Sequence, residues 1–366
     1  MTTHRDVDQM LRAHFEATAD RTVMDGQIDA IAALTAGRRQ QAAWLASLRS
    51  ILMSTTARSL GRPMSAPAWA LLFILALLIA IAAVGLTIGG WRLAPAPIVN
   101  GPMVFGRYEP AFDDTVIYIA RPDGSDQHIL VPGPNECPQI SPDGRRVALT
   151  FGTVNIDGSD RRTFAQNVDG VTLGCSTWSP DGTRLALEGF NDADPSKSGI
   201  FLANASDGSS AFRLTTNGAG GNDIPGDFSP DGRELSYLHG FTQGMGQLWI
   251  VDVANGTKRR VVATPVDSGA TWSPDGEWLV AVAGDHFLFV RPNGTHAHSL
   301  TVPVRAAWVG GAQFSPDGTR LLFNMALEGS DKNDIYTMNI DGTDLLQVTN
   351  TPDMNEYFTD WGIDPA

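Results

Sequence analysis

Short apolar runs fill the chain from about residue 103 onward, and clusters of Asp, Asn, Gly and Pro separate them. Runs of this kind between turn-forming residues are typical of β-strands. The pattern therefore predicts an all-β fold for residues 103–362, with a Pro-rich linker, 92–102, before it and a short tail, 363–366, after it.

Two turn motifs recur along this region. Ser-Pro-Asp-Gly begins at residues 141, 179, 229, 273 and 315. Asp-Gly-Ser, Asn-Gly-Thr or Asp-Gly-Thr begins at residues 123, 157, 207, 255, 293 and 341. Consecutive copies of the first motif lie 38, 50, 44 and 42 residues apart. Such spacings are typical of one four-stranded propeller blade.

Each motif has a local physical role. In Ser-Pro-Asp-Gly, proline presets φ and glycine adopts the left-handed conformation, which predicts a type I turn with a bulge. In Asp-Gly-Ser, both central residues tolerate positive φ, which predicts a two-residue hairpin. We therefore place the first motif between strands A and B of a blade, and the second between strands C and D.

The first blade lacks a strand A of its own. The segments 102–108, 116–122 and 128–131 supply only its strands B, C and D. The C-terminal segment 355–362 fits the missing position, because Trp361 stands where other blades carry a large aromatic residue. We predict a six-bladed β-propeller closed by pairing the C-terminal strand with the N-terminal three, which removes the open sheet edge.

A large aromatic residue precedes most of the turns, and a small or turn-forming residue stands two positions before it. Large side chains can wedge between neighbouring blades where small ones allow close approach. We therefore predict packing roles for Trp178, Phe228, Trp272, Phe314 and Trp361, with Ile140 as a smaller exception.

Residues 66–91 are predicted to form a transmembrane helix. No charge occurs from Met64 to Trp91, and at ~1.5 Å per residue this run exceeds the ~30 Å hydrocarbon core. The alternative, a cleaved signal peptide, normally has a shorter apolar run nearer the N-terminus. Since no earlier export signal is present, we expect residues 1–65 in the cytoplasm and the propeller outside it.

The cytosolic residues 1–65 are predicted to contain two amphipathic helices, within 5–17 and 42–53. Their apolar faces could pair with each other, with the membrane surface or with a partner helix. A short helical segment before a single span loosely resembles membrane anti-sigma factors. However, no cysteine precedes Cys137, so the zinc site of many such proteins is missing.

Charge is distributed unevenly along the chain. Residues 1–65 hold eight Arg and six acidic residues, about +2, which leaves 18 basic and 34 acidic residues, about −16, for the remainder. An acidic surface of this kind repels phosphate backbones. Nucleic acid is therefore excluded as an expected partner.

The repeat resembles a known family. An aromatic residue before Ser-Pro-Asp-Gly, together with Ile-Tyr-x-x-Asn-x-Asp-Gly-Thr and Leu-x-x-Val-Thr at 335–349, is similar to the propeller repeat of TolB. It also resembles the propellers of prolyl oligopeptidase and dipeptidyl peptidases. The TolB resemblance implies a bacterial envelope setting and a protein partner. TolB is soluble and carries an α/β domain where this chain has its predicted span, and the peptidases' Gly-x-Ser-x-Gly motif is absent.

Partner contacts are expected on one side of the ring. All the turns described above share one face, the turn face, so the B-to-C and D-to-A loops share the opposite face, the loop face. Because strand B of the first blade starts at the turn face soon after the span, the loop face should point away from the membrane. Variable loops usually carry recognition. The candidate contacts are Phe112, Phe241, Met245, Arg305 and Trp308, although each could instead fold back onto a blade edge.

Cys137 and Cys175 are the only cysteines, and each lies four residues before a Ser-Pro-Asp-Gly serine. They occupy equivalent positions at the start of the innermost strands of neighbouring blades. Both a disulfide that links the two blades and a pair of unbonded thiols fit this placement.

No catalytic, cofactor or metal site is predicted. The turn aspartates already have a role in their turns, and His296 and His298 share a strand face without a third ligand. Six-bladed lactonase-type enzymes need acidic and Asn ligands that converge on the axis, and the sequence does not exclude such a site.

These features predict a single-pass membrane protein that presents a TolB-like propeller outside the cytoplasm. We expect it to act as a non-enzymatic protein-binding or scaffold module of the cell envelope. One alternative is a propeller hydrolase or lactonase with an axial metal. Another is a transmembrane sensor or anti-sigma-like regulator that binds a cytosolic partner through residues 1–65.

Overall fold

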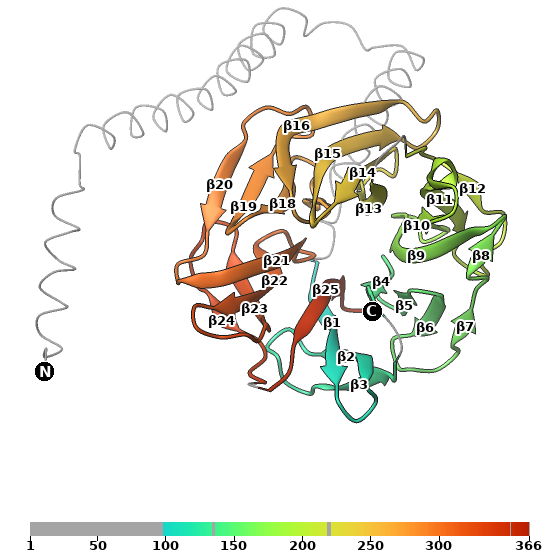
Figure 1. Cartoon of the computed structure of the whole chain (residues 1–366). Coiled ribbons are helices and arrows are strands. Elements are labelled where there is room, and N and C mark those ends of the chain that lie inside the picture. Colours follow the sequence, from blue (N-terminus) through green and yellow to red (C-terminus); the bar gives the residue numbers. More distant parts are fainter. Residues whose placement is uncertain (1–97, 134–135, 218–220, 352, 366) are drawn as a thin grey trace, which may run out of the picture. The chain divides into compact units, whose positions relative to one another are not determined.

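The computed structural model describes residues 98–133, 136–217, 221–351 and 353–365. Within these residues the strands form six sheets around a central axis, in a closed ring (Figure 1). Every pairing between neighbouring strands is antiparallel. This arrangement confirms the predicted six-bladed β-propeller.

In each blade neighbouring strands follow one another in hydrogen-bonded order. Blade 1 consists of β25 (Glu356–Ile363), β1 (Asn100–Glu109), β2 (Asp114–Ala120) and β3 (His128–Val131). Blade 2 consists of β4 (Gln139–Ile140), β5 (Arg146–Leu149), β6 (Gly152–Asn155) and β7 (Arg162–Thr163). Blade 3 consists of β8 (Asn167–Val168), β9 (Val171–Trp178), β10 (Arg184–Phe190), β11 (Gly199–Asn204) and β12 (Phe212–Arg213), with the short 3₁₀ helix η2 (Pro195–Lys197) before β11.

The other half of the ring follows the same plan. Blade 4 consists of β13 (Asn222–Phe228), β14 (Glu234–Thr242), β15 (Met245–Asp252) and β16 (Lys258–Val266). Blade 5 consists of β17 (Thr271–Trp272), β18 (Leu279–Ala283), β19 (His286–Val290) and β20 (His298–Thr301). Blade 6 consists of β21 (Ala306–Phe314), β22 (Arg320–Leu327), β23 (Asp334–Asn339) and β24 (Leu346–Gln347).

The two ends of the propeller sequence close the ring. β25 pairs antiparallel with β1, and Figure 1 shows this red strand beside the blue-green one. Arg107 of β1 donates through Nε to Glu356 of β25 at 2.7 Å, and both side chains are buried. The predicted closure by the C-terminal strand is therefore confirmed. Asn100, at the start of β1, accepts a hydrogen bond from the backbone of Asp317, which places the entry of the chain on the turn face.

The Ser-Pro-Asp-Gly turns have the predicted geometry. In blade 2 the backbone N–H of Gly144 donates to the carbonyl of Ser141 at 2.8 Å, and Gly144 has φ of 71°. The Ser141 hydroxyl donates to the carboxylate of Asp143, and the backbone N–H of Ser141 donates to the carbonyl of Arg146. This is a type I turn followed by a left-handed glycine.

The Asp-Gly-Ser turns differ from the prediction of a two-residue hairpin. Gly124 has φ of 78°, but Asp123 is not among the residues with positive φ. The N–H of Gly124 donates to the carbonyl of Arg121, and that of Arg121 donates to the carbonyl of Ser125. The carboxylate of Asp123 accepts hydrogen bonds from both the backbone N–H and the hydroxyl of Ser125. These bonds fix Asp123 in the turn, and its backbone does not take a positive φ. The prediction that both residues take positive φ was wrong.

The aromatic residues before the turns pack between blades, as predicted. Trp178, Phe228, Trp272, Phe314 and Trp361 are all at most 8% exposed. Phe228 of blade 4, for example, packs in one cluster with apolar side chains of blade 3. The indole N–H groups of Trp178 and Trp272 donate to backbone carbonyls of the preceding blade, at 3.0 Å each.

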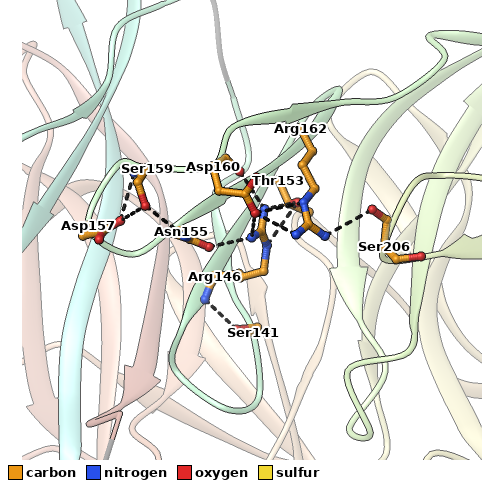
Figure 2. A network of polar contacts seen from close by, with 9 residues as sticks. All are labelled: Ser141, Arg146, Thr153, Asn155, Asp157, Ser159, Asp160, Arg162 and Ser206. Atoms are coloured by element: carbon orange, nitrogen blue, oxygen red, sulfur yellow. Dashed lines mark hydrogen bonds and ion pairs between the residues drawn. The ribbon is translucent and has the colours of Figure 1, made fainter.

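An arginine braces the turn-face end of blade 2. Figure 2 shows Arg146 at the centre of a polar network with Thr153, Asn155 and Asp160. Its guanidinium donates to Thr153 Oγ1 at 2.9 Å and to both the carbonyl and the carboxylate of Asp160, at 2.9 and 2.8 Å. These bonds tie strand B to strand C and to the turn that follows.

The same brace recurs in blade 6, where Arg320 bonds Thr337, Asn339 and Asp344. In blade 3, Ser210 stands where blades 2 and 6 carry the bracing aspartate, with φ of 55°. There the guanidinium of Arg184 makes no hydrogen bond to the described residues. The brace therefore requires the acid as well as the arginine.

Within residues 98–365, leaving out the gaps named above, no helix is long and apolar enough to cross a membrane. The predicted span at 66–91 and the predicted helices of residues 1–65 lie outside the described residues.

Arg146→Ala is expected to lower the free energy of unfolding by about 1–3 kcal/mol, because it removes several hydrogen bonds to a partly buried network. The matched variant Arg184→Ala should stay within about 0.5 kcal/mol of the unsubstituted protein. Urea denaturation of the two variants measures the difference. Equal losses of stability would show that the polar brace contributes nothing.

Candidate binding site on the loop face

A cavity of about 470 Å³ lies on the ring axis. Residues near the beginning of the innermost strands line it, which places it at the loop-face end of the axis. A smaller cavity, of about 270 Å³, is lined by the turn prolines and lies at the turn-face end. The two share Gln139, Thr177 and Asp227 as lining residues.

Apolar side chains form much of the wall of the larger cavity. Trp308 of β21 is 44% exposed, and Phe358 of β25 is 41% exposed. Trp308 lies directly over Gly310, where an added Cβ would clash with the indole ring. Phe358 has φ of 54°, at an irregularity in the pairing of β1 with β25. Such strained, bulged positions are over-represented at functional sites.

The charged groups of this cavity are all acids. Among the described residues that line it, the charged side chains are Glu188, Asp227 and Asp267, and no Lys, Arg or His is present. Thr177 donates to Asp227 at 3.1 Å, and the backbone of Gly284 donates to Asp267 at 2.6 Å. Burial raises the pKa of Asp227 to about 6 and also raises that of Glu188. The cavity is thus an electronegative hollow with apolar walls.

Three buried polar side chains of the wall have atoms without a protein partner. Ser176 Oγ, Asn324 Nδ2 and Thr359 Oγ1 make no hydrogen bond to the described residues. These side chains are 4%, 2% and 6% exposed, respectively. Buried polar atoms of this kind are uncommon, and leaving one unsatisfied costs about 1–3 kcal/mol. All three belong to residues that line the cavity, so the wall contains unpaired polar groups.

Asp360 lies below this cavity, in the wall of the turn-face hollow. Burial is the main cause that raises its pKa to about 7, and the charge of Asp227 adds to this effect. The backbone N–H of Ile140, which donates to its carboxylate at 2.6 Å, acts in the opposite direction and lowers the pKa. The axis therefore holds two acids that ionise well above the usual range.

The structure brings only some of the sequence-predicted contacts together. Phe241 and Trp308 line the cavity. Phe112 and Met245 are each 51% exposed on their loops, and Arg305 is exposed too, but these three residues do not line it. That any of these five candidate residues contacts a partner remains a prediction.

Sequence reasoning missed the axial acids, although a signal was present. The residue directly before each wedge residue is polar in every blade: Gln139, Thr177, Asp227, Thr271, Gln313 and Asp360. Since side chains alternate between the two faces of a sheet, this residue points toward the blade on the other side, as Thr177 does toward Asp227, and on an innermost strand it adjoins the axis. An acid at this position in two blades indicates an acidic axis.

Cys137 and Cys175, for which the sequence left two states open, are joined by a disulfide with a Cα–Cα distance of 5.5 Å. The bond links blades 2 and 3 in the wall of the cavity. Among the described residues, no three side chains of His, Cys, Asp or Glu lie close enough to hold a metal ion together.

The ring of antiparallel blades with an axial cavity defines the chain as a six-bladed β-propeller. Its fold is TolB-like. TolB from Acinetobacter baumannii matches with a TM-score of 0.59 and 19% sequence identity, over 71% of this chain and 66% of that one. This chain thus spans slightly less than two thirds of that TolB.

Two further solved structures share the fold. A TolB-type protein from Agrobacterium tumefaciens matches with a TM-score of 0.52 and 16% identity, over 74% of this chain and 99% of that one. A chain of a nidogen–laminin complex matches with a TM-score of 0.59 and 10% identity, over 73% of this chain and all of that one. No protein-family model and no curated protein matches the sequence.

Asp360→Asn is expected to stabilise the protein at pH 8 and to have little effect at pH 4. An aspartate whose pKa is raised in the folded state binds more protons than the unfolded chain, so it lowers stability as pH rises from about 4 to about 7. Removing this group should gain about 2–4 kcal/mol at pH 8. Thermal unfolding at both pH values measures the gain.

Asp231→Asn is the control for this experiment. Hydrogen bonds, first from the Ser229 hydroxyl and then from the Arg233 backbone, lower the pKa of Asp231. Its substitution should give no gain at pH 8. A gain in Asp360→Asn that does not depend on pH would contradict a titrating axial acid.

Proposed function

We propose that this chain is a membrane-anchored propeller that binds a protein partner through its loop face, outside the cytoplasm. The observation that carries the proposal is the loop-face cavity with its exposed aromatic rim. Residues 66–91 would supply the anchor, and residues 1–65 would lie in the cytoplasm. In this proposal the propeller acts as a scaffold of the cell envelope.

The rim has the composition of an interaction surface. Trp308 and Phe358, which line the cavity, are 44% and 41% exposed, and Phe112 and Tyr108, which do not line it, are 51% and 38% exposed. Phe112, Tyr108 and Phe358 all belong to blade 1 or its loop, and Trp308 belongs to the neighbouring blade 6. Exposed aromatic side chains around a concave site are typical centres of binding energy in protein interfaces.

The placement of the chain's entry supports the same face. β1 begins beside the Ser-Pro-Asp-Gly turn of blade 6, so a membrane anchor before it would approach the turn face and leave the loop face accessible. The TolB-like fold is compatible with an envelope protein, and one structure of the same fold comes from a protein–protein complex, that of nidogen with laminin. The alternatives of an axial-metal enzyme and of a sensor acting through residues 1–65 stay predictions.

Trp308→Ala is expected to reduce capture of the partner at least about tenfold, because truncating an aromatic hot spot costs about 2 kcal/mol or more. The full-length chain is crosslinked in membranes of the native host, and the captured proteins are quantified by mass spectrometry. Ile340→Ala is the matched control, since Ile340 is 43% exposed next to a turn-face loop. Equal capture by Trp308→Ala and by the unsubstituted chain would refute binding through the loop face.

A further inference from the structure

The acids of the loop-face cavity differ from two other buried acids of the propeller, Glu356 and Asp223. Glu356 is fully buried and pairs with Arg107, and Thr349 and Thr351 donate to it as well. Asp223 is also buried, and it contacts His239 at 2.7 Å. Each of these two buried acids therefore has a basic side chain against it, whereas the buried Asp360 accepts hydrogen bonds from the backbone, such as that from Ile140.

Glu188 and Asp227 have no such partner. No hydrogen bond or ion pair from the described residues reaches Glu188, and Asp227 receives only the hydroxyl of Thr177 on its carboxylate. They project from β10 of blade 3 and β13 of blade 4, so they act on the cavity from separate blades. Carboxylates that line a low-dielectric hollow without a base concentrate negative potential there, which attracts cations.

The rest of the wall specifies the kind of cation. Ser176 and Thr359 also belong to this wall, and their buried hydroxyls have no protein partner. Trp308 and Phe358 offer aromatic faces, which attract organic ammonium and guanidinium groups. Ile224 and Phe241 add apolar surface to the same cavity. A volume of about 470 Å³ is of the size that holds small organic ligands.

We propose that the loop-face cavity binds an ammonium or guanidinium group carried on an apolar stem. The source is either a Lys or Arg side chain of the protein partner or a free aliphatic amine. The cation lies against Asp227 and Glu188, and the stem lies along the aromatic wall. This inference rests on the proposed loop-face binding and names the chemical group that enters the cavity.

Isothermal titration calorimetry of the purified full-length chain with n-pentylamine and agmatine tests the proposal. Both should bind, and n-pentanol, which keeps the stem without the charge, should bind at least about tenfold more weakly, because charge-assisted contacts are the stronger ones. Asp227→Asn should weaken amine binding by about tenfold. Asp126→Asn removes the same charge from an exposed position near the turn face and should leave affinity unchanged.

Binding should also depend on pH. Because burial raises the pKa of Asp227 to about 6, its charged form is lost on acidification, and affinity for n-pentylamine should fall between pH 8 and pH 5. The Asp227→Asn variant should show a smaller dependence, which comes from Glu188, whose pKa burial also raises. Equal binding of n-pentanol and n-pentylamine would overturn the proposal, as would unchanged affinity in Asp227→Asn. Asp227-dependent binding of calcium chloride without any binding of the amines would also overturn it.

The two sources are distinguished in the crosslinking experiment. If added n-pentylamine releases the partner, the group is a basic side chain of that partner; if the amine binds and the partner stays, the ligand is a free amine. Failure of amine binding together with loss of capture in Trp308→Ala would refute this inference alone. Amine binding together with unchanged capture in Trp308→Ala would refute the proposed function and leave the amine site.

Discussion

The propeller depends on the pairing of its last strand, β25, with its first, β1. At this seam the buried ion pair of Arg107 and Glu356 joins the two ends of the propeller sequence, and the guanidinium also lies 4.2 Å from the ring centre of Tyr118. Removing one member of a buried pair leaves the other uncompensated, at a cost of about 3–5 kcal/mol. Closure also removes the free strand edges that an open sheet would expose. The contacts between the first and last strands therefore stabilise the closed ring as much as the contacts within any single blade.

Closure determines the chemistry of the axis, because side chains alternate along each innermost strand. The residue that wedges between blades, such as Phe228, is preceded by a residue on the opposite face of the innermost strand, such as Asp227, which lines both axial cavities. The same pattern repeats six times around the ring, so the packing requirement leaves one axial position in each blade open to any polar residue. Acids occupy this position in blades 1 and 4 and give the axis its negative character.

Local rules predicted much of this fold. Pro and Gly define the Ser-Pro-Asp-Gly turns within a few residues, and Trp361 identified β25 as the missing strand through its own motif position. The turn at Asp123 was mispredicted because its carboxylate bonds Ser125 and competes with the expected hairpin. The brace around Arg146 is local in sequence, but it depends on the directions of side chains within one hairpin and its turn. The raised pKa of Asp360 was inaccessible, because it arises where residues distant in sequence meet. For the same reason the sequence placed Phe241 and Trp308 on the correct face without showing that they line one cavity.

The strand that closes the ring also builds the candidate site. Along β25, Glu356 forms the seam, Phe358 takes a left-handed conformation at the cavity rim, and Asp360 lies buried on the axis. A strained residue and an uncompensated acid both lower the stability of the fold. They persist only where other contacts are strong enough to hold the backbone in this conformation. The buried ion pair and the indole bond from Trp361 to the carbonyl of Gly101 supply those contacts within one strand. Because β25 is the last strand of the propeller, the cavity wall is complete only when the ring has closed, which links the binding site to the finished fold.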